Sequence, residues 1–473
     1  MCGIVGYIGR EQAAPIEEGT LIDQAVFEEA FEAGAAQTAQ EAAAQSEPAE
    51  QIEPEPTEVP TGEIDLGAIF ANPKDVEMTD KYDRKSGYHS ALSPQAVDMT
   101  LPRFPIFKTA IHKGFFWRYL TPNHRPGPFV QPDIRNFCMP MSFRANNRYL
   151  MRIYYYGNRI SLEAHHSLGD GTGGMFVLNT ITANYLRLLG HEISNGYFVK
   201  DIHETPDPEE LEDAYMRYAN AKVCPPRPGE KTYRVRGTKE PFYTFNVIEG
   251  AMSTSEVLAV AKKYNASVTE YLNSVLLYAL LQKQQNEWHI RLHPVKIAMP
   301  VNLRRFFPSK TLRNFITMVY PSIDPRLGDY TFEEIITQVH HYMRYYINEK
   351  FLRGDITTNA STQRNPVIRV VPLFIKDFVV RQFYRIVQDK NSSAGLTNMG
   401  ALKVPDDMKP YIEKFDIYMG QPFSSRTNCA IASFEDTLTI NFASNIIESD
   451  VERYFFRKLV KDGVHVTIQS NRD

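Results

Sequence analysis

The sequence predicts an α/β protein built from two lobes, and two observations support this fold class. Segments typical of strands alternate with segments typical of helices from about residue 88 to the end of the chain. A proline-rich break at residues 224–229 divides these segments into two groups. We therefore expect a leader and linker over residues 1–80, an N-terminal lobe over 81–228 and a C-terminal lobe over 229–473.

The leader differs from the rest of the chain in composition. Residues 11–80 contain 18 acidic residues and one basic residue, Lys74. Residues 21–45 are rich in Ala, Glu and Gln, and residues 46–62 are rich in Glu and Pro. Neither stretch has enough large apolar residues to form a core, so we expect an acidic low-complexity segment outside the folded part. The remaining residues, 81–473, then carry a net charge of about +12.

Composition also argues against several classes of protein. The basic residues are spread through Tyr- and Phe-rich segments without Lys/Arg runs, so we expect no nucleic acid among the partners. The four cysteines are widely spaced and form no CxxC pair, which argues against a zinc site or a disulfide framework and favours a cytoplasmic location. No stretch approaches the roughly 18 apolar residues of a transmembrane helix, and the N-terminus lacks the pattern of a signal peptide.

The most apolar long segment is residues 367–387, but four charged residues interrupt it: Lys376, Asp377, Arg381 and Arg385. This pattern predicts an amphipathic helix. We expect the helix to pack on the core, and a position at a membrane surface is the alternative.

In the N-terminal lobe the pattern predicts a β-hairpin followed by a helix. Residues 149–156 and 159–166 suit two strands, and Gly157 and Asn158 supply the turn between them. Apolar residues then recur at helical spacing and stop at Gly190. These apolar residues are Met175, Leu178, Ile181, Tyr185 and Leu188.

In the C-terminal lobe two capping boxes mark the starts of consecutive helices. Ser253 with Glu256, and Ser267 with Glu270, have the S/T-x-x-E spacing, and apolar residues follow each pair. The expected elements of this lobe are helices over 254–264, 269–285, 332–351 and 450–462, and strands over 295–300 and 437–443.

The candidate functional motif is the sequence HHSLGDG at residues 165–171, which joins the second strand of the hairpin to the helix. Strand alternation places His166 on the face shared with Leu162, toward the buried side, and His165 on a more polar side. An oriented, shielded imidazole can take a proton from an attacking hydroxyl or amine near neutral pH. His166 is therefore the candidate general base.

Asp170 follows the two histidines after the chain has turned. Its carboxylate could orient the imidazole directly, or it could brace the turn through a salt bridge to an arginine. Gly169 and Gly171 on either side of it indicate a tight backbone that needs such a brace.

Two alternatives concern the histidine pair. Metal binding requires both rings to reach one ion, yet adjacent strand residues point to opposite faces, and no HExxH motif occurs. In the other alternative both histidines are structural and the glycines only form a turn.

A third alternative is a dinucleotide-binding loop. Gly169, Gly171 and Gly174 satisfy the GxGxxG pattern between a strand and a helix, and Glu192 lies at a suitable distance beyond them. Against it, Asp170 would place a carboxylate where a pyrophosphate should bind, and the preceding strand belongs to a hairpin.

The motif HHSLGDG matches the HHxxxDG signature of the chloramphenicol acetyltransferase-like superfamily, which includes condensation domains and alcohol acetyltransferases. Four further segments, in the expected order, resemble the alcohol acetyltransferase branch, so that the resemblance covers about residues 88–473. These segments are LPRFPIF (101–107), GFFWRYL (114–120), AMPVNLRRFFPSKTLRNF (298–315) and LTNMGALKVPDDM (396–408).

This resemblance implies an acyltransferase fold of two chloramphenicol acetyltransferase-like lobes with an active-site tunnel between them. The co-substrate would be an acyl-CoA or a carrier-bound acyl thioester, with no permanently bound cofactor or metal. The partners would be a small-molecule acyl acceptor, with a hydroxyl or an amine, and optionally an acyl carrier protein. His166 would be the general base, Asp170 the structural aspartate and Arg304 its partner, with His165 and Gly171 completing the motif.

The first 16 residues resemble the N-terminus of glutamine:fructose-6-phosphate aminotransferase, in which an N-terminal cysteine is the nucleophile. Cys2 occupies the matching position. The resemblance ends near Ile16, so the glutamine pocket is missing and we expect no glutaminase activity. The first strand of the acyltransferase fold would then be absent or supplied by residues 63–70. A degenerate first lobe leaves an alternative function, a protein that binds an acyl thioester or a carrier protein without turnover.

Overall fold

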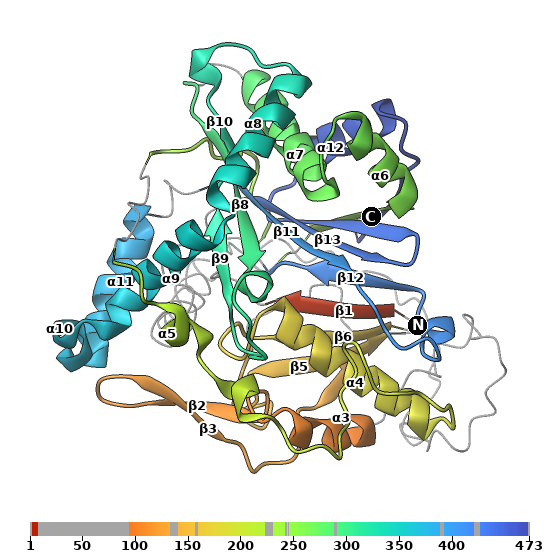
Figure 1. Cartoon of the computed structure of the whole chain (residues 1–473), viewed down its shortest axis with the longest axis vertical. Helices are drawn as coiled ribbons and strands as arrows, with labels where there is room; N and C mark the ends of the chain where they lie inside the picture. The colour runs from red at the N-terminus through yellow and green to blue at the C-terminus, as the bar shows by residue number, and fades with distance from the viewer. Residues whose placement is uncertain are drawn as a thin grey trace, which may run out of the picture.

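The computed structural model describes residues 2–7, 94–132, 141–156, 159–222, 230–241, 244, 246–287, 291–387, 392–420 and 426–471. These residues form an α/β fold with a five-stranded sheet, an eight-stranded sheet and a two-stranded hairpin (Figure 1). The predicted fold class is therefore confirmed. Most of the leader, the turn at 157–158 and the break at 224–229 lie outside the described residues.

The five-stranded sheet carries the N-terminal core. Its strand order is β12-β1-β6-β5-β4. The bounds are β1 Cys2–Tyr7, β4 Val130–Pro132, β5 Met151–Tyr156, β6 Arg159–Ala164 and β12 Lys414–Tyr418. Strands β5 and β6 pair antiparallel, which confirms the predicted hairpin. Helices α3 (Pro94–Thr100) and α4 (Gly171–Leu188) pack together beside this sheet, and Gly190 follows α4 with a φ of 94° (Figure 1).

One interior strand of this sheet, β1, comes from the first residues of the chain. Strand β1 pairs parallel with β6 on one side and with β12 on the other. The expectation that all of residues 1–80 lie outside the fold is therefore wrong for Cys2–Tyr7. Residues 63–70, the other proposed source of a first strand, lie outside the described residues.

The eight-stranded sheet carries the C-terminal core. Its strand order is β10-β8-β11-β13-β14-β7-β15, and β9 pairs with β8. The bounds are β7 Asn246–Ser253, β8 Val295–Asn302, β9 Ile316–Val319, β10 Ser322–Ile323, β11 Ala394–Ala401, β13 Thr427–Phe434, β14 Thr437–Ser444 and β15 Thr467–Ser470. Helices α6 (Thr254–Lys263), α7 (Val268–Gln285), α8 (Phe332–Tyr346) and α12 (Asp450–Lys461) cover one side (Figure 1).

The predicted helix starts are present as caps. Ser267 and Glu270 form a complete capping box at α7, and the Ser253 hydroxyl accepts the Glu256 N–H at α6. The helix predicted over 332–351 is instead two helices, because α8 ends at Tyr346 and α9 spans Glu349–Arg364. The Asn348 side chain accepts the Phe351 N–H at 3.0 Å and so caps the start of the second helix.

Strand pairing crosses the predicted boundary between the lobes. Strand β12 belongs to the C-terminal part of the sequence, yet it lies at the edge of the N-terminal sheet. The N-terminal core likewise includes Ala430, Ala432 and Phe434 from β13. The lobe limits at residues 80 and 228 remain predictions. Strand β12 comes after residue 228 in the sequence, yet it pairs within the N-terminal sheet.

The remaining elements of the described residues include the two-stranded hairpin, three short or peripheral helices and several 3₁₀ turns. They are β2 (Thr109–Lys113), β3 (Arg118–Pro122), α5 (Ala214–Tyr218), α10 (Pro366–Val370), α11 (Leu373–Val387) and 3₁₀ turns at Leu101–Arg103, Pro208–Leu211, Leu303–Arg305, Pro325–Leu327 and Lys409–Tyr411.

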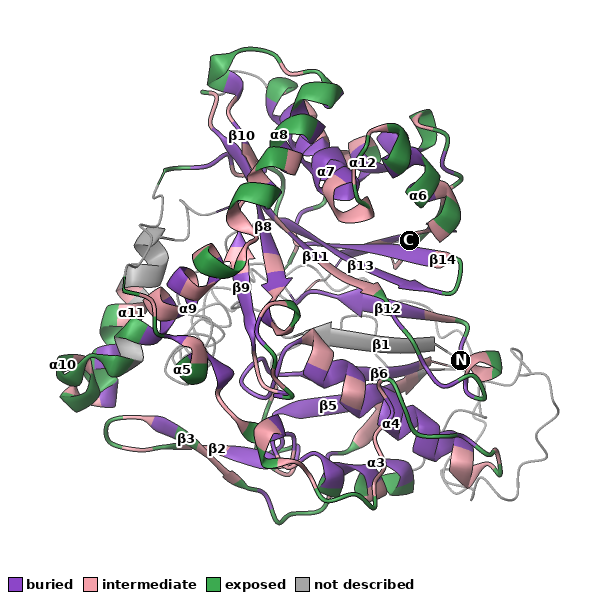
Figure 2. Cartoon of the chain, in the orientation of Figure 1, coloured by how far each residue is buried: buried purple, intermediate pink, exposed green. Residues whose placement is uncertain are grey.

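The segment 367–387 forms helices α10 and α11, but its predicted packing on the core is wrong for much of the described part. Leu373 is buried, whereas Phe374 and Phe378 are exposed. Figure 2 shows exposed stretches along α10 and α11. In the parts of the chain that the structure describes, no helix is long and apolar enough to cross a membrane.

Candidate active site

The motif lies between the end of β6 at Ala164 and the start of α4 at Gly171. Asp170 starts the helix as its N-cap, with extended backbone angles. Its Oδ1 accepts the Gly173 N–H at 3.2 Å, and its carbonyl accepts the Gly174 N–H at 3.0 Å. A carboxylate at this position also interacts favourably with the positive end of the helix dipole.

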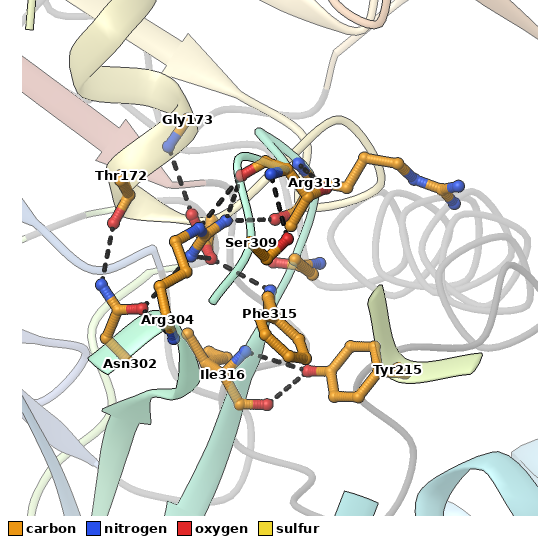
Figure 3. Close-up of polar contacts among 12 residues, drawn as sticks. Thr172, Gly173, Tyr215, Asn302, Arg304, Ser309, Arg313, Phe315 and Ile316 are labelled. Carbon is orange, nitrogen blue, oxygen red and sulfur yellow. Dashed lines mark hydrogen bonds and ion pairs between the residues drawn. The ribbon is translucent and has the colours of Figure 1, made fainter. Parts of the chain in front are cut away.

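The other carboxylate oxygen of Asp170 binds the C-terminal lobe. Arg304 Nη1 donates to Asp170 Oδ2 at 2.6 Å, and the Phe315 N–H donates to the same oxygen at 3.0 Å (Figure 3). Arg304 is held in turn by the carbonyls of Thr311 and Arg313, at 2.7 to 3.0 Å. The ion pair implied by the family resemblance is therefore present, and it braces the motif against residues 302–315.

Two glycines, Gly169 of the motif and Gly173 in the first turn of α4, allow this segment to come close. A Cβ atom added at Gly169 would lie 2.4 Å from the Leu312 carbonyl oxygen, and one added at Gly173 would lie 2.2 Å from it. The backbone of Leu312 thus occupies the space that glycine leaves. This packing, together with the Asp170 carboxylate at the helix start, argues against the dinucleotide alternative.

His166 is held by one amide side chain. Its Nδ1 lies 2.8 Å from Asn314 Oδ1, and Asn314 Nδ2 donates to the His166 carbonyl at 2.6 Å. Because the amide NH₂ is used on the carbonyl, its oxygen faces the ring, and the neutral imidazole carries its proton on Nδ1. The lone pair of the ring is then on Nε2, the atom that a general base requires.

Burial sets the charge of this ring. The His166 side chain is only 4% exposed, and burial lowers its pKa below the ordinary value. The hydrogen bond that the ring donates to Asn314 and the charge of Asp170 oppose this shift. His166 is therefore neutral at neutral pH and competent to accept a proton.

His165 is also buried, so its predicted position on a more polar side is wrong. The Ser167 N–H donates to His165 Nδ1 at 3.2 Å, and the Ser167 hydroxyl lies 2.9 Å from the same atom. The ring of Phe143 lies edge-on at 6.4 Å between centroids. Burial lowers the pKa of His165 to about 4, with a smaller contribution from the neighbouring His166. These contacts make His165 a neutral residue of the core beside the candidate base.

Metal binding gains no support from the described residues, which contain no cluster of three or more side chains able to hold an ion. Gly171 is the first residue of α4.

Sequence reasoning missed Asn314, although it lies within the segment 298–315 that resembles the acyltransferase family. An asparagine at this position does not by itself indicate a functional role in the sequence. The contact between Asn314 and His166 becomes visible only when the structure brings residues 298–315 close to the motif.

No protein-family model and no curated protein matches the chain. Among solved structures, the chain is similar to the epimerization domain from the third module of tyrocidine synthetase B, with 11% identity, a TM-score of 0.47 and coverage of 78% of this chain and 86% of that one. It is similar to polyketide synthase associated protein 5 from Mycobacterium tuberculosis, with 13% identity, a TM-score of 0.46 and coverage of 78% and 91%. It also spans 40% of the nonribosomal peptide synthetase FmoA3, with 13% identity and a TM-score of 0.46 over 78% of this chain. Similarity at such low sequence identity and TM-score carries no argument about the chemistry of this chain. That chemistry has to be argued from the residues of the chain itself.

Proposed function

We propose that this protein is an acyltransferase that moves an acyl group from an acyl thioester to a hydroxyl or amine acceptor, with His166 as the general base. The observation that carries the proposal is the orientation of one buried neutral imidazole. Asn314 fixes its tautomer, and the Asp170–Arg304 pair holds the loop that presents it.

In the proposed reaction His166 Nε2 removes the proton from the acceptor as its oxygen or nitrogen attacks the thioester carbonyl. A new C–O or C–N bond forms, the C–S bond breaks, and the thiolate leaves with the electron pair. The imidazolium then returns the proton to the thiolate. Asp170 and Arg304 act as positioning residues, because their charges are used on each other and on backbone groups.

The acyl donor is tested with the purified full chain and a panel of acyl-CoA thioesters, with hydroxyl and amine acceptors, by measuring release of free thiol and mass of the product. We expect His166→Ala to reduce kcat by about 10²- to 10⁴-fold. His341→Ala, at an exposed histidine of α8, is the matched control and should retain full activity. If His166→Ala keeps full activity, the proposed mechanism is wrong.

The Asn314→Ala variant tests whether Asn314 positions the His166 ring and tunes its pKa, or only maintains the local structure. The hydrogen bond that the His166 ring donates to Asn314 raises the pKa of His166, so its loss should lower that pKa further. The acidic limb of the pH profile of kcat/KM should therefore move to lower pH while kcat falls. An unchanged pH profile would show that Asn314 does not affect the proton transfer by His166.

Acyl-thioester binding without turnover is the competing function. Calorimetry that detects binding of an acyl-CoA, together with no product by mass spectrometry across the acceptor panel, would favour it. Repeating the panel with acyl groups on a carrier protein distinguishes the two classes of donor.

A further inference from the structure

Lys296 of β8 is a buried lysine without a partner for its ammonium group. It is 9% exposed, whereas lysine is almost never buried unless it is paired. Within the described part of the chain, its Nζ forms no hydrogen bond and no ion pair. The same atom is not among the fully enclosed polar atoms that lack a partner in the described residues, so it keeps contact with solvent. A buried charge without a counter-charge is costly, and this one points to an anionic ligand.

The side chain of Lys296 lies on the face of β8 that turns away from the C-terminal core. Alternate residues of this strand, from Val295 to Val301, belong to that core, so Lys296 and Asn302 share the opposite face. The Asn302 side chain donates to Thr172 Oγ1 in the first turn of α4 at 3.3 Å. Lys296 and Asn302 are six positions apart, which corresponds to about 20 Å of strand. Lys296 therefore lies at one end of this face and the candidate active site at the other.

The carboxylates near Lys296 are bound to an arginine. Burial lowers the pKa of Lys296, and the charges of Glu230 and Asp324 oppose this shift. Arg326 Nη2 lies 2.6 Å from Glu230 Oε1 and 2.6 Å from Asp324 Oδ2, and its Nε donates to Asp324 Oδ1 at 2.8 Å. The two positive and two negative charges of these four residues cancel, and both carboxylates are held by the guanidinium.

Two further basic residues make the surroundings of Lys296 positive. Burial lowers the pKa of His293, three residues before Lys296, and the charges of Lys231 and Arg291 lower it further. Lys231 and Arg291 are exposed, and in the described part of the chain neither side chain forms a hydrogen bond or an ion pair. The segment that carries Lys231 is tied to the residue before β8 by a backbone hydrogen bond of 2.8 Å. Lys231 and Arg291 thus add two positive charges that no described carboxylate pairs with.

We propose that Lys296, with Lys231 and Arg291 beside it, forms a binding site for the phosphate group of a small molecule. The ammonium group of lysine binds phosphate as a compact point charge, and the exposed bases attract the anion to the site. A phosphate group carries enough negative charge to match the two positive charges in excess. The group could belong to a free phosphate compound or to an acyl-CoA, and only the second source rests on the proposed function.

The test is isothermal titration calorimetry of the purified full chain with inorganic phosphate, with CoA and with pantetheine, which lacks phosphate. We expect Lys296→Met to weaken binding of the phosphate-bearing probe at least about tenfold, since it removes a charge-assisted hydrogen bond. Binding of pantetheine should not change. Lys263→Met makes the same change at an exposed lysine of α6 and is the matched control, which should bind like wild type.

Thermal unfolding separates a ligand site from a structural lysine. In buffer without phosphate, Lys296→Met should unfold at the same or a higher temperature than wild type, because an apolar side chain replaces a buried charge. Added phosphate or CoA should then raise the unfolding temperature of wild type and leave that of Lys296→Met unchanged. The double variant Lys231→Ala/Arg291→Ala, at exposed positions, should weaken binding by only about two- to fivefold and reduce its dependence on salt.

The probes also identify the source of the phosphate. Binding of inorganic phosphate that depends on Lys296 indicates a free phosphate compound, whereas dependence on Lys296 for CoA alone indicates the acyl donor. The proposal is wrong if neither probe depends on Lys296, or if Lys296→Met unfolds at a lower temperature than wild type without ligand. No readout measures acyl transfer, so a failure here is distinguishable from a failure of the proposed function.

Discussion

At the residue scale, the two adjacent histidines show what strand alternation can and cannot predict. Alternation correctly expects His166 on the buried side, and it expects His165 on a more polar one. Both are buried, because β6 lies inside the sheet between β1 and β5 and both of its faces are covered. Whether a strand has a solvated face depends on its neighbours, and the motif itself contains no information about them.

Burial of His165 predicts a specific dependence of stability on pH. Its pKa is about 4 in the folded protein and near 6.5 when unfolded. Below pH 6.5 the unfolded state binds a proton that the folded state does not, so the free energy of unfolding falls as pH decreases. The loss is complete near pH 4 and amounts to about 3 kcal/mol. Urea unfolding at several pH values measures it.

His165→Gln removes this titrating group and keeps an acceptor for the Ser167 N–H. We expect the variant to lose less stability than wild type between pH 6.5 and 4. The buried His166, whose pKa is also lowered, leaves part of the dependence in place. His341→Gln, at an exposed position, should behave like wild type, and equal slopes for His165→Gln and wild type would contradict the prediction.

At the scale of elements, local patterns predicted the helix starts well and the approach of distant segments poorly. The side-chain cap at α6 and the capping box at α7 are formed by residues three apart, so the sequence contains the complete signal. The crossing of Leu312 over the start of α4 joins residues far apart in the chain, and it is visible in the sequence only as two glycines. The same separation hid Asn314, which reaches His166 across 148 positions.

This crossing predicts an unusual response to alanine in α4. Alanine normally favours a helix by about 1 kcal/mol over glycine. Gly173→Ala should nevertheless destabilise the protein by about 1–3 kcal/mol, because the new methyl group would lie 2.2 Å from the Leu312 carbonyl oxygen. Chemical denaturation measures the change, and Leu312→Ala should not rescue it, since the contact is with the backbone.

Gly250 of β7 provides the matched comparison. An added Cβ there would lie 2.2 Å from the ring of Phe456, a side chain. Truncation of this ring in Gly250→Ala/Phe456→Ala should therefore remove the clash that Gly250→Ala creates. Rescue of Gly173→Ala by Leu312→Ala would show that the approach of the Leu312 backbone is not what requires glycine at residue 173.

At the scale of the whole molecule, the α/β class followed from composition and periodicity, but the order of strands did not. Strands β1 and β12 are far apart in the sequence and lie next to each other in the N-terminal sheet. Their pairing is parallel, and parallel partners are joined by long connections that leave no turn signal in the sequence. Local composition therefore assigns the first residues to a leader, because the acidic stretch that follows them dominates that composition.

The position of β1 links the N-terminus to the candidate base. Tyr7 pairs with Ala164, the last residue of β6 and the one before His165. Ile4 lies in the middle of β1, opposite Asp416 on one side and Ser161 on the other.

Ile4→Pro should disrupt a ladder in the interior of the sheet, where proline is not tolerated, and cost about 3 kcal/mol of the free energy of unfolding. Ala13→Pro changes a residue of the acidic low-complexity segment that the sequence composition predicts to lie outside the fold, and on that prediction it should leave stability unchanged in urea unfolding. Because the end of β6 positions the motif, Ile4→Pro should also reduce turnover of an acyl thioester. Equal stability of the two proline variants would mean that β1 contributes nothing to the stability of the sheet. Residues 2–7 would then be assigned to the leader.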